Sequence, residues 1–138
     1  MATRILFLCT GNSVRSQIAE AFLRKYGGDA FIAFSAGLEP KGIHRLTIQV
    51  MQEIGIDISK HQSKNLTAFD GQNFDYVITL CGSANETCPL YIGGTKKTHI
   101  GFDDPAKAHG LPEAILTEFR RVRDEMKEKL TVFFKQRK

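Results

Sequence analysis

The chain has 138 residues, of which 42% are apolar and 25% charged, and its formal net charge is +4. This length and composition are typical of one globular domain, which we expect to span residues 1–138. No apolar run approaches the roughly 18 residues that cross a bilayer, and the run that begins at Ile5 lacks a signal-peptide cleavage site, so we expect a cytoplasmic protein without membrane contact. The mild positive charge favours anionic partners, but RNA-binding aromatic motifs are absent, and we expect no nucleic acid binding.

The first half of the chain alternates strand-like and helix-like segments. Residues 4–9 form an apolar run typical of a strand buried on both faces. Residues 16–26 repeat apolar side chains at helical spacing and predict a helix with one buried stripe. Residues 31–36 predict a second strand, and residues 44–54 predict a second helix.

The second half continues the same alternation. Residues 75–81 predict a third strand, and residues 97–102 predict a weaker fourth strand. A long helix is predicted over residues 111–134, where apolar side chains recur at a spacing near 3.6. The alternation predicts an α/β fold, a three-layer sandwich around a central, mostly parallel, four-stranded sheet.

Three cysteines, Cys9, Cys81 and Cys88, are an odd number in a chain without a secretion signal. A structural disulfide is not expected in a reducing compartment, so reactive, metal-binding or inert core thiols remain. No C-x2-C pair is present and no histidine lies near Cys81 and Cys88, so we predict no metal site. Cys9 and Cys81 each end a predicted strand, which is the edge where parallel sheets bind ligands.

The eight residues from Cys9 to Ser16 join the first predicted strand to the first predicted helix. A loop there can point backbone N–H groups inward, next to the positive end of the helix. We expect Gly11 to permit the tight backbone and Asn12 to accept a left-handed conformation. The predicted oxyanion-binding residues are Thr10, Gly11, Asn12, Ser13, Val14, Arg15 and Ser16.

Arg15 and Ser16 give this loop its predicted chemistry. The Arg15 guanidinium can grip two oxygens of a tetrahedral oxyanion. Together with the helix end and a hydrogen bond from Ser16, it should favour the thiolate form of Cys9, the predicted nucleophile. The alternative is a buried core cysteine with an incidental arginine; an ATP-binding G-x4-G-K-[ST] loop is excluded because the motif is absent.

The segment CTGNSVRSQ at residues 9–17 closely resembles the signature of thioredoxin-coupled arsenate reductases, which share the fold of low-molecular-weight tyrosine phosphatases. The phosphatases themselves usually carry proline where this chain has Gln17. The resemblance covers nearly the whole chain and continues through SAG, IGIDIS, VITLCG, FDDPA and FRRVRDE. It implies a reductase of the phosphatase-like fold.

The resemblance also implies roles for the remaining site residues. Asp104, directly before a proline, is the implied proton donor; a simple Asp-Asp-Pro turn is the alternative. In the family mechanism Cys9 attacks arsenate, Cys81 then attacks Cys9 and releases arsenite, and Cys88 attacks Cys81 to leave a disulfide that thioredoxin reduces. A capping box at residues 83–86 predicts a short helix toward Cys88, which disulfide formation would have to unwind.

Two positions depart from the family pattern. Val14 stands where the signature commonly has another cysteine, which the three-thiol relay does not use. Some members bind potassium behind the loop through Asn, Glu, Ser and Asp. Asn12, Glu20 and Ser35 match three of these, but the fourth position is Lys64, whose ammonium would take the place of the cation, so we expect little potassium stimulation.

The sequence leaves three hypotheses of function. The leading one is reduction of arsenate by a monomer with no bound cofactor, with phosphate or sulfate as analogues and electrons from thioredoxin, or else from glutaredoxin and glutathione. The first alternative is a low-molecular-weight protein tyrosine phosphatase that uses Cys9, Arg15 and Asp104; the reductase itself should keep weak phosphatase activity. The second is a non-enzymatic redox or oxyanion-sensing module.

Overall fold

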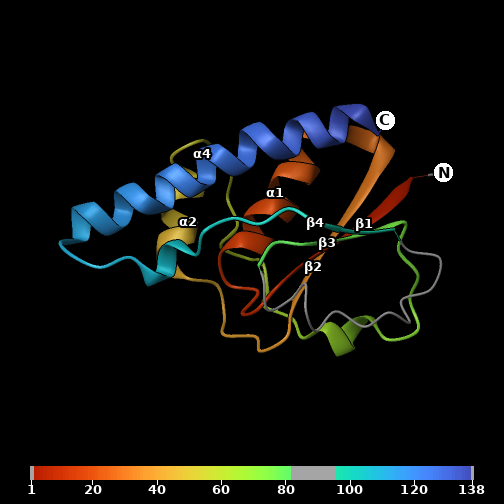
Figure 1. The fold of residues 1–138 in the computed structure, drawn as a ribbon, viewed down its shortest axis with the longest axis horizontal. Helices are drawn as coiled ribbons and strands as arrows, with labels where there is room; N and C mark the ends of the chain where they lie inside the picture. The colour runs from red at the N-terminus through yellow and green to blue at the C-terminus, as the bar shows by residue number, and fades with distance from the viewer. Residues whose placement is uncertain (1, 82–95, 138) are drawn as a thin grey trace.

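The computed structural model describes residues 2–81 and 96–137 (Figure 1). The strands are β1 (Thr3–Cys9), β2 (Phe31–Gly37), β3 (Tyr76–Thr79) and β4 (Lys96–His99). The α-helices are α1 (Arg15–Tyr26), α2 (Arg45–Gln52) and α4 (Pro112–Gln136), and the short 3-10 turns are η1 (Gly28–Ala30), η2 (Leu66–Phe69) and η3 (Pro105–Lys107). None of the described helices is long and apolar enough to cross a membrane.

The four strands form one parallel sheet in the order β2-β1-β3-β4. β1 lies between two neighbours, and its last five residues are all buried. Its residue Leu8 pairs with Ala36 on one side and with Thr79 on the other. The predicted α/β class with a four-stranded parallel sheet is confirmed.

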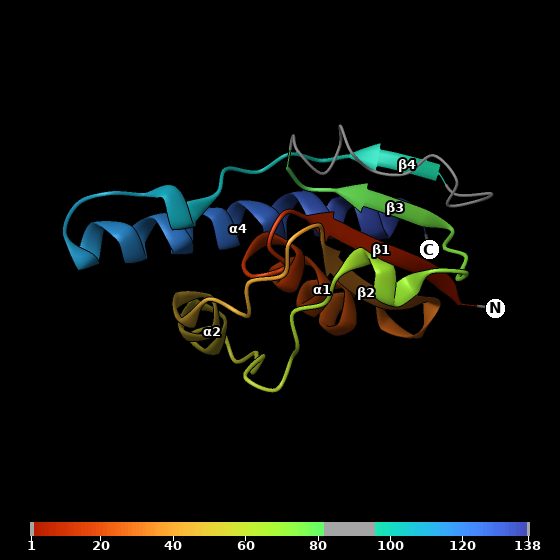
Figure 2. The same ribbon diagram turned by 90° about the horizontal axis from the view of Figure 1, so that it is seen from below.

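The sheet has a layer on each face. Figures 1 and 2 show α1 and α4 together on one face, and the segment that carries η2 on the opposite face. Because alternate strand residues point to opposite faces, Phe7 of β1 meets Phe134 of α4, with ring centroids 6.3 Å apart. Phe34 of β2 points the other way, toward Phe69 and Phe74 at 5.7 and 5.3 Å. These contacts account for the predicted three-layer arrangement.

The first half of α1 is buried on nearly all sides, which differs from the single apolar stripe expected from its sequence. Ser16, Gln17 and Glu20 are 0%, 0% and 2% exposed. Polar side chains in such positions must find hydrogen-bond partners inside the protein, because an unpaired buried polar group is costly. The buried polar side of α1 therefore faces a network rather than water.

The predicted third and fourth strands differ from the structure at their ends. β3 ends at Thr79 rather than residue 81, and β4 ends at His99 rather than residue 102. Sheet-like hydrogen bonds do continue further, from Ile100 N to Thr79 O at 2.9 Å and from Phe102 N to Leu80 O at 3.1 Å. The two segments thus leave the regular sheet while staying side by side. The helix predicted from residues 83–86 toward Cys88 lies outside the described residues.

A cluster of ion pairs around Glu53, with one buried member, Arg123, fixes α2 against α4. Arg123 of α4 is 8% exposed and donates to Glu53 Oε1 and to Val50 O, at 2.8 and 2.9 Å. Arg120 binds the same carboxylate from outside, and its hydrogen bond is the main cause that lowers the pKa of Glu53. The cluster ties the C-terminal end of α2 to α4, and the opposite end of α2 begins after His44, which lines the candidate site.

Candidate active site

Cys9 ends β1, as predicted, and its thiol is almost fully buried at 2% exposure. Its Sγ lies 2.9 Å from the hydroxyl of Ser16. That hydroxyl accepts a hydrogen bond from Asn12 Nδ2 at 2.7 Å. Since the amide nitrogen can only donate, the hydroxyl hydrogen of Ser16 is left to donate to the Cys9 sulfur. Asn12 and Ser16 thus form a chain of hydrogen bonds that ends on the Cys9 sulfur.

Asn12 is fully buried and has a left-handed backbone with φ of 47°, as expected. Its Oδ1 accepts hydrogen bonds from Lys64 N at 2.7 Å and from Gln17 Nε2 at 3.0 Å. With the bond to Ser16, the Asn12 amide thus connects the loop to α1 and to residues 61–65. The oxyanion loop, residues 9–16, is therefore held from behind by buried hydrogen bonds.

Backbone carbonyls of the oxyanion loop are bound by the segment that follows β2. Thr10 O accepts from Glu39 N at 2.8 Å, Gly11 O accepts from Lys41 N at 3.0 Å, and Ser13 O accepts from His44 N at 3.1 Å. When the carbonyls of a tight loop are bound on one side, its N–H groups turn to the other side and form a nest that suits anions.

The glycine that this geometry requires is Gly37 rather than Gly11. A Cβ at Gly11 would meet the Lys41 and Ser13 side chains at an ordinary 3.6 Å. At Gly37, which pairs with Cys9, a Cβ would lie 2.7 Å from both Asn12 N and Thr10 O. The expectation for Gly11 is therefore wrong, because the close approach involves the neighbouring strand and not the loop's own backbone.

Arg15 begins α1 and reaches back over the loop. Its Nη1 donates to Phe102 O at 3.2 Å, and its Nη2 lies 3.6 Å from Asp104 Oδ2. Its Nε is buried and has no partner in the described part of the chain. A buried guanidinium N–H without an acceptor is costly, and a bound oxyanion would supply one. Asp104, whose side chain is 23% exposed, also caps η3 by accepting from Ala106 N at 3.0 Å.

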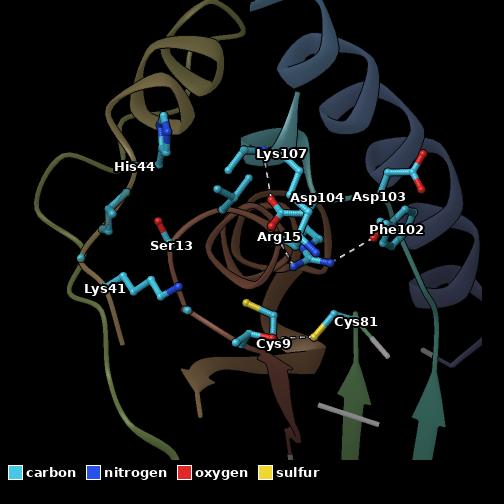
Figure 3. A pocket seen from close by; sticks show the side chains of 16 residues that line it. Cys9, Ser13, Arg15, Lys41, His44, Cys81, Phe102, Asp103, Asp104 and Lys107 are labelled. Carbon is cyan, nitrogen blue, oxygen red and sulfur yellow. Dashed lines mark hydrogen bonds and ion pairs between the residues drawn. The ribbon is translucent and has the colours of Figure 1, made fainter. Parts of the chain in front are cut away.

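Cys81 lies across the loop from Cys9, at the edge of the sheet where both were predicted. Its Sγ is 3.2 Å from Thr10 Oγ1. Cys9, Cys81, Arg15 and Asp104 all line one pocket of about 1000 Å³, which Figure 3 shows from close by. The structure thus brings together the predicted nucleophile, arginine, acid and second thiol. Cys88 lies outside the described residues.

The buried carboxylate of Glu20 lies behind the loop, where the resemblance in sequence implies a cation in some family members. It accepts from Ser35 Oγ at 2.7 Å and lies 3.3 Å from Arg24 Nη2 and 3.5 Å from His61 Nδ1. Lys64 does not put its ammonium there, contrary to expectation; Nζ donates to Gln62 O at 3.0 Å, and it is the Lys64 backbone N–H that reaches Asn12. Arg24 therefore supplies the positive partner of Glu20, and the ring of His61 lies beside the same carboxylate.

His44 is a pocket residue that sequence reasoning missed. Its ring lines the pocket and caps α2, since Nδ1 accepts the N–H of Leu46 at 3.1 Å. The available signal was its place at the predicted start of a helix, but histidine is not among the residues that usually cap helices.

Comparisons with known proteins agree with this geometry. Residues 4–138 match the family described as low molecular weight phosphotyrosine protein phosphatase. The chain belongs to this family. A protein named arsenate reductase from Halalkalibacterium halodurans is 46% identical over 129 residues, covering 94% of this chain and 93% of that protein. The predicted resemblance to arsenate reductases is confirmed.

Solved structures give the same relationship. A structure described as an arsenate reductase in the phosphate binding state has a TM-score of 0.81 and 31% identity, and the match covers 97% of this chain and 98% of that chain. A thioredoxin-dependent arsenate reductase from Corynebacterium glutamicum has a TM-score of 0.62 and 30% identity, over 96% of this chain and 63% of that one. The predicted phosphatase-like fold is confirmed by these matches.

Proposed function

We propose that this chain reduces arsenate to arsenite. The observation that carries the proposal is the placement of a second cysteine, Cys81, in the same pocket as Cys9 and Arg15. A phosphatase needs one thiol and water, whereas a reductase must deliver two electrons, which neighbouring thiols can supply by successive exchange. Arsenate reductase activity is also supported by the relatives that carry this name.

In the first step, arsenate binds to the oxyanion loop, residues 10–16, and to the unpartnered Nε of Arg15. The sulfur of Cys9 attacks arsenic, an S–As bond forms, and one As–O bond breaks. Asp104 gives a proton to the departing oxygen, which leaves as water. Arg15 contacts both the oxyanion site and the acid, so it aligns the two sides of the reaction.

In the second step, Cys81 attacks the sulfur of Cys9. An S–S bond forms while the S–As bond breaks, and its electron pair stays on arsenic, which leaves as arsenite. The hydroxyl of Thr10, 3.2 Å from Cys81 Sγ, helps to hold Cys81 next to the loop. Cys88 then attacks Cys81 and returns Cys9 to its thiolate, and a dithiol reductant reduces the Cys81–Cys88 disulfide. We propose thioredoxin as this reductant, because one related enzyme depends on it, with glutaredoxin and glutathione as the alternative.

The test is NADPH consumption with arsenate, thioredoxin and thioredoxin reductase. We expect turnover by the wild type and none by Cys9→Ser, Cys81→Ser or Cys88→Ser. Turnover that appears only with glutaredoxin and glutathione would change the electron donor and leave the relay intact. Full turnover by Cys81→Ser would contradict the three-thiol relay.

A second candidate, a phosphatase, is favoured by the family match and by the shared Cys9, Arg15 and Asp104. Hydrolysis of an aryl phosphate should need Cys9 but not Cys81, because no electrons are transferred. Cys81→Ser is therefore a matched control: it should lose arsenate turnover and keep phosphatase activity. No arsenate turnover together with efficient aryl phosphate hydrolysis would assign the chain as a phosphatase, and neither activity would favour a sensing module.

We also propose that potassium stimulates the enzyme little. The fourth candidate ligand position is a lysine, and Glu20 is already paired with the guanidinium of Arg24, so the residues present do not fit a cation. A titration with potassium at constant ionic strength tests this, and clear activation would contradict it.

A further inference from the structure

His44 connects three parts of the candidate site. Its backbone N–H donates to Ser13 O of the oxyanion loop at 3.1 Å. Its ring Nδ1 accepts the N–H of Leu46, in the first turn of α2, at 3.1 Å. The ring packs on Phe119 of α4, with centroids 4.9 Å apart. Figure 3 shows His44 on the wall of the pocket that faces Asp104.

The hydrogen bond from Leu46 fixes the protonation of the ring. A backbone N–H can only donate, so Nδ1 must be an acceptor, and a neutral His44 carries its hydrogen on Nε2. A protonated imidazole has a hydrogen on both nitrogens and cannot accept this bond. A positive ring at the N-terminal end of a helix is also opposed by the helix dipole. His44 can therefore cap α2 only in its neutral form.

Charged groups around the His44 ring shift its pKa in opposite directions. Burial lowers the pKa of His44 from its ordinary value, and the neighbouring Arg45 lowers it further, whereas Asp104 across the pocket raises it. Arg15 of α1 and the pocket lysines Lys41 and Lys107 add positive charge, while α4 offers the uncharged ring of Phe119. The neutral form therefore predominates at pH 7, and protonation follows as the pH falls below the ordinary range of histidine.

We propose that His44 is a positioning residue for the oxyanion loop and that it acts only while its Nδ1 is unprotonated. When the ring takes up a proton, Leu46 N–H loses its acceptor and the first turn of α2 loosens. The hydrogen bond to Ser13 O starts from the same residue and loosens with it, so the loop binds oxyanions less tightly. The inference rests on the proposed function only in that the loop binds an oxyanion.

Sulfate binding provides the test, because sulfate keeps its charge between pH 5.5 and 7.5. The wild type is compared with His44→Asn, which keeps a helix cap that does not titrate, and with His44→Ala, which has none. When the pH falls from 7.5 to 5.5, we expect the dissociation constant of the wild type, divided by that of His44→Asn, to rise by roughly threefold to tenfold. This is the effect of losing one helix cap. Other groups titrate in the same way in both proteins, so their effects on sulfate binding cancel in this ratio.

Hydrogen exchange of the Leu46 amide gives an independent readout. In the wild type its protection should fall at pH 5.5, in His44→Asn it should persist at both pH values, and in His44→Ala it should be low at both. A sulfate ratio that stays constant, or that falls because the protonated ring attracts the anion, would overturn the proposal. Arsenate turnover is not used in either measurement, so failure of the proposed function would be seen separately.

Discussion

The two walls of the pocket are held in different ways. Behind the oxyanion loop, Asn12, Ser16 and Gln17 are fully buried, and hydrogen bonds join all three. On the opposite wall, Asp103 has a side chain that is 80% exposed and is paired with Arg121, which is itself 43% exposed. The loop is thus fixed by buried bonds, whereas Asp103 on the opposite wall is held by an exposed ion pair.

This difference has energetic consequences. A buried polar group that loses its partner costs about 1–3 kcal/mol, whereas an exposed ion pair contributes about 0–1 kcal/mol. The hydrogen bonds behind the oxyanion loop are therefore costly to break, whereas the exposed ion pair of Asp103 contributes little to stability.

The largest effect is expected when the close approach behind the loop is blocked. Gly37→Ala would place a Cβ 2.7 Å from Asn12 N and Thr10 O, so the loop must shift. We expect a loss of about 2–3 kcal/mol in the free energy of unfolding and more than about tenfold weaker phosphate binding. Thermal unfolding and calorimetry measure the two effects. Gly11→Ala is the matched control, and a control that proved more damaging than Gly37→Ala would contradict the geometry.

Two substitutions of Asn12 separate the effect of its backbone conformation on stability from that of its side-chain hydrogen bonds. Asn12→Gly keeps the left-handed conformation but leaves Lys64 N and Gln17 Nε2 without their acceptor, so we expect a loss of about 2 kcal/mol in unfolding free energy. Asn12→Ala should lose about 1 kcal/mol more, because a Cβ disfavours this backbone. Denaturant unfolding of both variants measures the difference. Equal stabilities would show that the left-handed conformation is not unfavourable for alanine at this position.

A smaller effect on stability is expected when the pH is lowered, because His61 behind the loop then takes up a proton. Burial lowers the pKa of His61 and outweighs Glu20, which raises it. The folded state disfavours the charged His61 ring. The protein therefore has its full stability above the ordinary histidine pKa and loses part of it as the pH falls through the lowered value. The unfolding midpoint of the wild type should decrease more between pH 7 and 5 than that of His61→Gln. Parallel pH profiles of the two proteins would rule this contribution out.

The smallest effect is expected on the exposed wall. Arg121→Ala removes ion pairs to Asp103, Glu118 and Glu125, all with exposed partners. We expect a loss of less than about 1 kcal/mol in unfolding free energy, which decreases further at high salt. Denaturant titrations at low and high salt measure this. A loss as large as that of Asn12→Gly would remove the distinction between the two walls.

Much of this arrangement could be predicted from the sequence. The apolar run before Cys9 and the helical spacing after Ser16 placed the oxyanion loop between a strand and a helix, and the structure agrees. Strand order follows less directly, because pairing between β1 and β3 joins residues that are far apart in the chain. The ends of β3 and β4 were misplaced because apolar character continues through residues 80 and 102 after the regular sheet has ended.

What could not be predicted depends on partners distant in sequence. The helical spacing of residues 16–26 predicts one buried apolar stripe, yet Gln17 and Glu20 are buried as well, because Gln62 and Ser35 supply polar partners. The need for glycine at residue 37 arises only when β2 lies against the loop. His44 has no motif of its own, since its role comes from the meeting of Ser13, Leu46 and Phe119.

The oxyanion loop draws its supports from several distant segments, which has a consequence for protein synthesis. Ser13 is bound by residue 44, Asn12 by residue 64 and Arg15 by residues 102 and 104. A ribosome that builds the chain from its N-terminus makes Cys9 early, but the last of these supports emerges much later. Until then the contacts that shape the loop around Cys9 are incomplete, and an unfinished or prematurely terminated chain lacks the formed pocket.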